Sequence, residues 1–482
     1  MKPGRINSTD RTLIFIVPTS TISGMDEFLY RADKTGEPGF GKIAEDRVSD
    51  RRRTAVLIAL GLAAGPATAL GLARFAYALL LPTMQSALHW SLATAGVMNT
   101  ANAAGYVLGA LAAAPLARRL GAKPVFLGGM ALTAVLLAAS ASTGDLVVLL
   151  ILRLLAGAAG AATFIIGGAL AAALGQAKAA THSAMLLGVY FGGGGLGIAV
   201  SGIVLPLILA HTSASSGWRW GWGALGIGAG LATLAAISAT IRAPLLGRSD
   251  GQRPTRLVGL RFVLLAYTAY GAGYIGYMTF IVAYLKAGGA GPVELSTFWA
   301  ILGLAAVLGG VVWGPILGRL RHGLGPALLM AVVTIGAVLP LLTSAIPVVY
   351  TSAALFGIAF LAVVAAVTHV ARTALAPAQW TAAIAILTIG FALGQCVGPL
   401  LSGVLADRSG GIEAGLALSA AILAAATAIC FAHRTRPLPP NLQTTPDFPT
   451  TTDSRVDTGC SSRPARTPLA IVHPHGPLPC WP

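Results

Sequence analysis

The feature that most limits the folds open to this chain is a series of long apolar runs along most of its length. Many of the runs reach about 20 residues, the length that an α-helix needs to cross a bilayer core of roughly 30 Å. Only 10% of the residues are charged, against about 25% in an ordinary soluble domain, so a normal water-facing surface cannot be covered. A transmembrane β-barrel would show alternating segments of about 10 residues, whereas these runs are longer and continuous. The sequence therefore predicts an all-α polytopic membrane protein.

The runs are numerous enough to predict twelve transmembrane helices. Their approximate ranges are 55–83, 92–114, 124–143, 146–173, 182–210, 218–241, 260–285, 296–317, 325–345, 347–371, 379–406 and 413–432. Residues 1–53 form an N-terminal tail, and the basic segment 242–259 separates two six-helix bundles, 54–241 and 260–432. Residues 433–482 contain 11 of the 28 prolines and many threonines, which is typical of a disordered tail.

The net charge of +16 could suggest a nucleic-acid-binding protein, but its distribution indicates membrane topology instead. Basic residues occur in alternate loops. One set of loops carries Arg51, Arg52, Arg53, Arg118, Arg119, Lys123, Lys178, Arg242, Arg248, Arg253, Arg256, Arg261, Arg319, Arg321, Arg372, Arg434 and Arg436, and the other carries only Arg219, Lys286 and Arg408. Because Lys and Arg concentrate in cytoplasmic loops, both tails are predicted to be cytoplasmic, in a protein of the plasma (inner) membrane without a nucleic-acid partner.

An internal repeat is found when the sequence is compared with itself at an offset of 200 residues. The matched pairs are Gly71 with Gly271, Tyr77 with Tyr277, Pro115 with Pro315, Arg119 with Arg319, Gly157 with Gly357, and Gly194 with Gly394. One offset that holds from the first span to the fifth predicts two six-helix halves in the same orientation. Parallel repeats of this kind build transporters with a single site between the halves, near the membrane midplane.

Several stretches resemble one family. The loop "PLARRLGAKP" is similar to the loop between spans two and three of the major facilitator superfamily, with Arg118 where an Asp is usual. "RLLAGAAGA", from Arg153, resembles the Arg-x-x-x-Gly pattern of the fourth span, and "GLARFAYALLLP", "NTANAAGYVLG" and "GQCVGPLLSG" resemble the YbfB/YjiJ branch. The resemblance covers roughly residues 55–432 and implies the major facilitator fold and alternating access, driven by an ion gradient or by the substrate's own gradient. It implies no particular substrate.

Two arginines lie inside predicted spans, where a charge is costly. At 1.5 Å per residue, Arg74 and Arg153 both lie roughly 10–14 Å below the non-cytoplasmic surface. The acids between residues 54 and 432 are Asp145, Asp250, Glu294, Asp407 and Glu413, all in predicted loops or at span ends. In one interpretation the two arginines face the central cavity and bind an anionic group. In the other, each caps backbone carbonyls, or Arg153 pairs with Asp145 while Arg74 extends toward the surface.

Polar side chains on two further spans extend this candidate site. Tyr267, Tyr270, Tyr274 and Tyr277 share one face of the seventh span, and Asn99, Asn102 and Tyr106 form a similar face on the second. The predicted substrate-binding residues are Arg74, Tyr77, Asn99, Asn102, Arg153, Tyr270, Tyr274 and Tyr277. The alternative is structural, with the tyrosines packed between the halves and the asparagines hydrogen-bonded between helices.

A second set of residues is predicted to act in helix packing, gating or proton coupling. Glycines at every fourth position leave a helix face without side chains, which lets backbones approach closely and slide. The predicted gating and packing residues are Arg118, Arg119, Gly188, Gly192, Arg319, Gly390, Gly394, Gly398 and Pro399. His182 and His369, near the cytoplasmic ends of spans five and ten, are candidates for proton coupling, and each has a structural alternative.

The sequence lacks the motifs of several other classes. It has no P-loop, no H-E-x-x-H motif and no paired carboxylates within a span, so the chain is not predicted to be an enzyme. Its four cysteines have no metal-site spacing, and no cofactor is expected. The predicted function is secondary active transport of a small solute by a monomer in the lipid bilayer, and the predicted substrate is a small organic anion. The alternatives are a proton-coupled drug or metabolite exporter and a non-transporting receptor or scaffold.

Overall fold

The computed structural model describes residues 53–176, 180–213, 215–244, 258–320, 324–376, 379–408 and 410–432. Within these ranges the regular structure is helical, and the predicted all-α fold is confirmed. Three predicted segments lie wholly or largely outside the described residues, namely residues 1–52 of the N-terminal tail 1–53, residues 245–257 of the central loop, and the C-terminal tail 433–482.

The helices follow the predicted spans closely. The first, Arg53–Leu88, contains α3 (Ala64–Pro66), the π-helical η1 (Ala67–Phe75) and α4 (Tyr77–Leu88). After it come α5 (Leu92–Leu120), α6 (Ala122–Ser140), α7 (Leu146–Gln176), α8 (Ala180–Ala210), α9 (Gly217–Arg242), η2 (Val258–Leu260), α10 (Arg261–Ala287), α11 (Pro292–Arg319), α12 (Leu324–Leu342), α13 (Ile346–Phe360), α14 (Ala362–Ala374), α15 (Trp380–Arg408) and α16 (Gly411–Ala432). The predicted span 347–371 is thus divided at Leu361 into α13 and α14.

Eleven helices in the described part of the chain are long and apolar enough to cross a membrane. α10, which matches the seventh predicted span, is not among them. Its 27 residues are long enough to cross, but they include five tyrosines, which lower the mean hydropathy. The count of twelve spans therefore stays a prediction that depends on α10.

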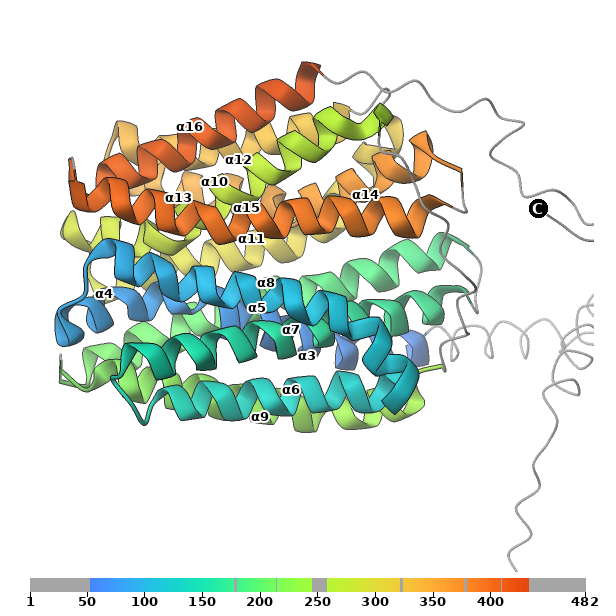
Figure 1. Ribbon diagram of the computed structural model, residues 1–482, viewed down its shortest axis with the longest axis horizontal. Helices are drawn as coiled ribbons and strands as arrows, with labels where there is room; N and C mark the ends of the chain where they lie inside the picture. The colour runs from blue at the N-terminus through green and yellow to red at the C-terminus, as the bar shows by residue number, and fades with distance from the viewer. Residues whose placement is uncertain are drawn as a thin grey trace, which may run out of the picture.

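The helices lie in two groups, one above the other in Figure 1. The first group comprises the helices of residues 53–242, and the second comprises those of residues 258–432. The groups meet where α5 contacts α15, α8 contacts α11, and α4 contacts α10. We call the end of the molecule at which His89–Ser91 joins α4 to α5 the α4–α5 end, and the opposite end, where Gly121 joins α5 to α6, the α5–α6 end.

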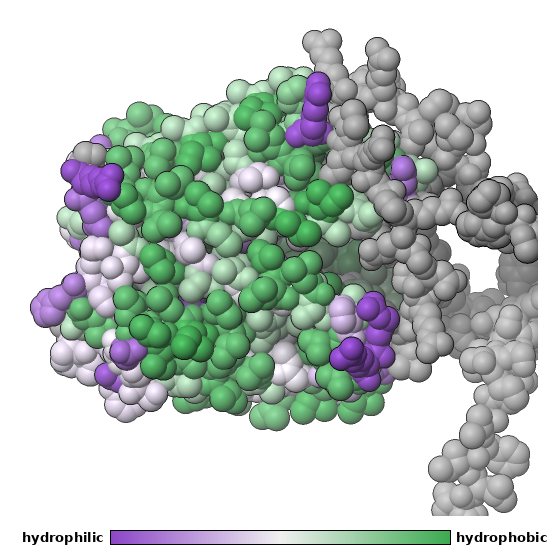
Figure 2. Space-filling model, viewed as in Figure 1, coloured by the Kyte–Doolittle hydropathy of each residue, from purple (hydrophilic) through white to green (hydrophobic). Residues whose placement is uncertain are grey.

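An apolar belt surrounds the helices on the face shown in Figure 2, with hydrophilic residues gathered at its two ends. Both groups carry large apolar side chains that are more than half exposed. Examples from both groups are Leu111, Val135, Ile227, Leu265 and Val311. Apolar side chains at such positions would be unfavourable in water, and they fit the hydrocarbon core of a bilayer.

Glycines in α8 allow two neighbouring helices to approach closely. A Cβ added at Gly193 would lie 1.9 Å from a carbonyl oxygen of the first span, and one at Gly195 would lie 2.5 Å from a carbonyl oxygen of α11. The predicted packing pair, Gly188 and Gly192, is less tightly packed, since added Cβ atoms would meet their nearest neighbours at 3.2 and 3.6 Å. The closest backbone contacts of α8 are therefore made by glycines beside the predicted pair.

The glycine face of α15 packs against α10. Cβ atoms added at Gly390, Gly394 and Gly398 would lie 2.6, 1.9 and 2.1 Å from the nearest atom of α10. One residue further, the carbonyl oxygen of Pro399 would be 2.4 Å from a Cβ at Gly96 of α5, so α15 is in close contact with both groups at this level. These distances fit the packing role predicted for the four α15 residues.

Candidate functional site

Arg74 lies in the π-helical segment of the first span. Pro66 has no N–H group and interrupts the helical hydrogen bonding just before this segment. Hydrogen bonds within a π-helix connect residues five apart, as from the Ala76 N–H to the Gly71 carbonyl at 3.0 Å. The resulting wider turn carries the guanidinium into the protein interior, where the Arg74 side chain is only 3% exposed.

The Arg74 guanidinium has a neutral hydrogen-bond partner in the second group. Its Nη2 donates to Oε1 of Gln395 in α15, and Gln395 Nε2 donates to the hydroxyl of Tyr274 in α10 at 2.8 Å. The guanidinium carbon also lies 5.2 Å from the ring centroid of Tyr106, a cation–π distance. Arg74 has five N–H donors, and the described chain engages one of them.

Arg153 comes from α7 and is completely buried beside the same part of the first span. Its Nη1 donates to the Ala73 carbonyl, and its Nη2 donates to Asn99 Oδ1 at 3.1 Å. The guanidinium carbon lies 5.1 Å from the Tyr77 ring and 5.5 Å from the Trp222 ring. Carbonyl capping, the structural alternative considered for this arginine, is therefore present, although its buried Nε has no hydrogen-bond partner.

The two predicted asparagines make different contacts. Asn99 accepts from Arg153 and donates through Nδ2 to Thr279 Oγ1 of α10 at 2.7 Å, so it connects the two helix groups. Asn102 donates to the backbone carbonyl of Arg153 at 3.1 Å, a bond between α5 and α7 within the first group. Asn102 thus makes the interhelical contact considered as its structural alternative.

The tyrosine hydroxyl groups on one face of α10 have partners in two different helices, α13 and α15. The Tyr270 hydroxyl donates to the Phe360 carbonyl at 2.8 Å, and the Tyr277 hydroxyl lies 3.0 Å from Ser352 Oγ, so both contact α13. Tyr274 instead accepts from the amide that contacts Arg74, while its ring stacks on Tyr270 at 5.3 Å. Of these three predicted residues, Tyr274 is the one that the structure connects to Arg74.

The hydrogen bond and the ring stacking of Tyr77 are made within the first group. Its hydroxyl donates to the Ala95 carbonyl at 2.8 Å, and its ring stacks on Trp222 at a centroid distance of 6.3 Å. The ring belongs to the aromatic surroundings of Arg153, within the first group.

Carboxylates are absent from the partners of both buried arginines in the described helices. The acidic residues there are Asp145, Glu294, Asp407 and Glu413, and all four lie at or near helix ends. Asp145 accepts from the Val148 N–H at 2.9 Å rather than pairing with Arg153. Since Arg74 and Arg153 are the only charged side chains among the buried residues described, the core carries two positive charges with neutral hydrogen-bond partners.

The remaining predicted residues lie away from these arginines. Arg118, Arg119 and Arg319 are exposed near the α5–α6 end, and His369 is exposed in α14. His182 lies in α8, but its side chain is outside the described part of the structure. Gating by the arginines and proton coupling by the histidines remain predictions.

Sequence reasoning missed Gln395 as a site residue, although it lies within the quoted stretch "GQCVGPLLSG". The signal was an uncharged polar side chain in the middle of a predicted span, where polar groups are unfavourable without partners. Thr279 and Trp222 were also missed. Threonine is common at contacts between transmembrane helices, and tryptophan is common at the membrane–water interface, so neither residue was conspicuous.

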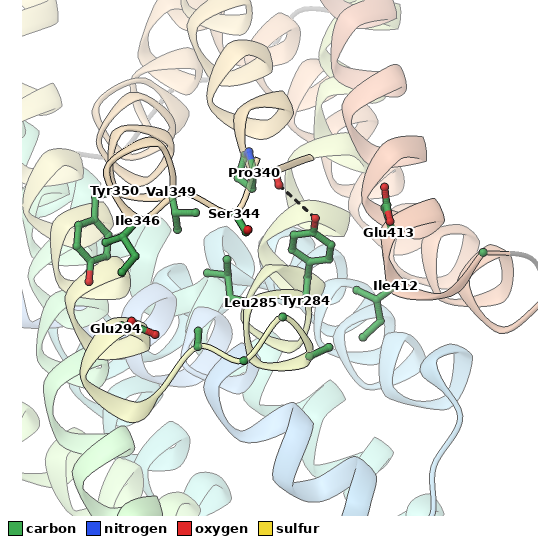
Figure 3. A pocket seen from close by; sticks show the side chains of 15 residues that line it. Tyr284, Leu285, Glu294, Pro340, Ser344, Ile346, Val349, Tyr350, Ile412 and Glu413 are labelled. Carbon is green, nitrogen blue, oxygen red and sulfur yellow. Dashed lines mark hydrogen bonds between the residues drawn. The ribbon is translucent and has the colours of Figure 1, made fainter. Parts of the chain in front are cut away.

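Two cavities open at the α4–α5 end. One has a volume of about 500 Å³ and lies in the second group (Figure 3), where Glu294 and Glu413 stand on opposite sides and Tyr284 donates to the Pro340 carbonyl at 3.2 Å. The other, of about 240 Å³, lies between the groups and is lined in part by Thr83 and Lys286. Neither is lined by Arg74 or Arg153.

A protein-family model described as "Uncharacterised MFS-type transporter YbfB" matches residues 66–431. No curated protein matches the chain. The fold is similar to that of a bacterial homologue of the human lysosomal transporter Spinster, in an inward-facing and unoccupied conformation, with a TM-score of 0.61 and 16% identity over 79% of this chain and 97% of that chain.

Two further solved transporters show the same fold. The nucleoside transporter NupG has a TM-score of 0.57 and 15% identity, over 78% of this chain and 98% of that chain. FucP, an MFS transporter in the outward conformation, has a TM-score of 0.55 and 16% identity, over 80% of this chain and 99% of that chain. The structural likeness extends over almost the whole length of each of these proteins.

Proposed function

The chain belongs to the family of YbfB-type MFS transporters, and from this premise we propose that it transports a small organic anion across the plasma membrane by alternating access. The observation that carries the anion proposal is the pair of buried arginines with neutral partners. A charged side chain at the centre of a membrane helix costs about 2.5–3.5 kcal/mol on insertion scales. An anion bound beside Arg74 would compensate part of this cost, and release of the anion would restore the full cost.

The donors left on Arg74 support a bound anion. One N–H is engaged by Gln395, and the guanidinium can present others in the fork geometry that matches a carboxylate. Arg153 is suited to a different role, because its side chain is completely buried and two of its N–H groups already donate to protein acceptors, against one for Arg74. In the proposal Arg74 binds the solute, while Arg153 fixes the first span beside it and adds positive potential.

The proposal places the α4–α5 end outside and both tails in the cytoplasm, following the distribution of basic residues. Transport is proposed to be uptake or exchange rather than proton-coupled drug export. A proton carrier of the carboxylate type would need an acid at the level of the arginines, and the four acids among the described residues lie at or near helix ends.

Flux into liposomes tests the function. Purified protein in proteoliposomes preloaded with an unlabelled organic anion is expected to accumulate the same labelled anion from outside, and empty liposomes are not. A thermal-shift screen against metabolite anions and cationic drugs selects the compounds, since a ligand of the native state raises its melting temperature. Binding without flux would support the receptor alternative, and flux of cationic drugs alone would contradict the anion proposal.

Variants of Arg74 test the site. Arg74→Lys retains the charge but loses the fork geometry, so anion affinity is expected to fall, and Arg74→Gln is expected to reduce it further. If Arg74 has only a structural role, both variants will melt earlier while the folded fraction keeps its affinity. Full affinity in Arg74→Gln would exclude this residue from the anion site.

A further inference from the structure

The side chain of Gln395 crosses from one helix group to the other and contacts the guanidinium assigned above to the solute. Its orientation follows from chemistry: an arginine can only donate, so the amide oxygen must face Arg74, and the amide nitrogen then faces Tyr274. One amide oxygen on a guanidinium reproduces half of an arginine–carboxylate contact, without the charge.

We propose that Gln395 is an internal competitor that occupies, in this conformation, the position taken by the carboxylate of the solute. The inference rests on the proposed anion transport and narrows it to one class, the monocarboxylates. A carboxylate binds a guanidinium more strongly than a neutral amide does, because both partners are then ionised. It can therefore displace the amide oxygen when it reaches Arg74.

Displacement of the amide has a mechanical consequence. The Arg74–Gln395 bond connects the first span to α15, so an anion that replaces Gln395 removes a hydrogen bond between the two groups. The backbone near Gln395 is also weakly constrained on one side, because Pro399 has no N–H to offer to the Gln395 carbonyl four residues earlier. Solute binding is thus coupled to loosening of the contact between α15 and the first group.

The limit to one carboxylate follows from the number of free cationic groups. Arg74 and Arg153 are the only buried charged residues described, and Arg153 uses both Nη atoms on Ala73 and Asn99. A second carboxylate on the solute would have to lose water without gaining a comparable partner, which is unfavourable. The Tyr274 hydroxyl, which now accepts from Gln395, is able to donate to the same single carboxylate once the amide has moved.

The test measures binding of acetate, benzoate, benzamide and succinate to the wild type and three variants by thermal shift and equilibrium dialysis. Benzamide has nearly the shape of benzoate but no charge, and succinate carries two carboxylates. The wild type is expected to bind at least one monocarboxylate, and its affinity for benzamide and for succinate is expected to be clearly lower. Gln395→Glu supplies a permanent carboxylate and is expected to reduce monocarboxylate affinity by at least about 100-fold, since like charges would then be adjacent.

Gln395→Leu removes the competitor and is expected to keep or raise the affinity, by up to about tenfold for one lost hydrogen bond. Thr100→Val is the matched control. Thr100 Oγ1 donates to the Cys396 carbonyl at 2.7 Å, so its loss also removes a bond between the groups, but one that leaves Arg74 untouched. Affinity in Thr100→Val is expected to equal that of the wild type. This control distinguishes competition between Gln395 and the solute from a general weakening of the contact between the two helix groups.

A measurement of thermal stability tests the contact between residues 74 and 395 without any ligand. Gln395→Glu is expected to raise the melting temperature by pairing with Arg74, and the gain should disappear when Arg74→Gln is combined with it, as a double-mutant cycle would show. Wild-type affinity in Gln395→Glu, or weaker binding in Gln395→Leu, would overturn the inference while leaving anion transport intact. If the wild type binds only succinate, the monocarboxylate assignment is wrong, and if it transports no anion at all, the proposed function fails with it.

Discussion

Replacement of Gly394 by alanine should destabilise the protein far more than the same replacement at a glycine outside the helix contacts. A Cβ at Gly394 would lie 1.9 Å from the carbonyl oxygen of Thr268, about 1.5 Å short of an ordinary 3.4 Å contact. The obstacle is backbone, so it cannot move aside as the tip of a side chain does, and α15 must separate from α10. Overpacking of this kind costs about 1–3 kcal/mol.

Gly230 in α9 is the matched control, because an added Cβ would meet nothing within 4 Å. There the helix propensity of alanine should stabilise the protein by up to about 1 kcal/mol. The same propensity gain applies at Gly394, which also lies inside a helix, so it cancels in the comparison. The two substitutions should therefore differ by the overpacking cost alone, about 1–3 kcal/mol, measured as thermal unfolding of purified protein in one detergent. Equal melting temperatures would show that the α10–α15 contact is looser than described, and Gly394→Leu with wild-type flux would remove its role in transport.

Two further predictions concern topology and the contact between the groups. Reporter fusions after Ser142 and Thr343 should lie outside the cell and fusions after Ala122 and Gln252 inside, and a reversed pattern at Gln252 would contradict the two-bundle arrangement. Asp407→Asn should weaken the α4–α5 end, because the Asp407 carboxylate accepts from the backbone N–H groups of Leu92 and Ala93 at 2.9 and 2.8 Å. Helix-capping interactions of this type contribute about 0.5–2 kcal/mol. A cysteine introduced at Thr83, which is buried and lines the cavity between the groups, should therefore react faster with a membrane-impermeant thiol reagent in this variant, and an unchanged rate would refute the expectation.

The course of the helices could be predicted because the length and hydropathy of each run determine it. The π-helical turn around Arg74 could not be predicted. The apolar periodicity of one sequence does not distinguish the backbone hydrogen bonds of an α-helix, which connect residues four apart, from those of a π-helix, which connect residues five apart. The division at Leu361 was missed for a similar reason, as the run 347–371 is apolar on both sides of it. In each case hydropathy reports where a helix lies and carries little information about its local winding.

The candidate site was predictable in part. Two arginines without an acid in their spans already indicated a common positive region, and the structure brings Arg153 into contact with the residue before Arg74. The partners were not predictable, because they come from other helices: Gln395 lies 321 positions from Arg74, and Asn99 and Ala73 lie 54 and 80 positions from Arg153. The tyrosine face shows the same limit, since its spacing identifies one side of α10 but does not tell which hydroxyl contacts α13 and which contacts Gln395.

Most of the described hydrogen bonds between the two groups involve the first part of α5. On α5 they involve Leu92, Ala93, Asn99 and Thr100, all in the first nine residues of a helix that continues to Leu120. Arg74 and Gln395 make the remaining described bond between the groups. Opening of the α4–α5 end requires all these bonds to break, and a solute carboxylate can replace only the last of them. In the proposed mechanism, solute binding therefore reduces the barrier to opening without removing it, which is the behaviour needed of a carrier that must not open freely when empty.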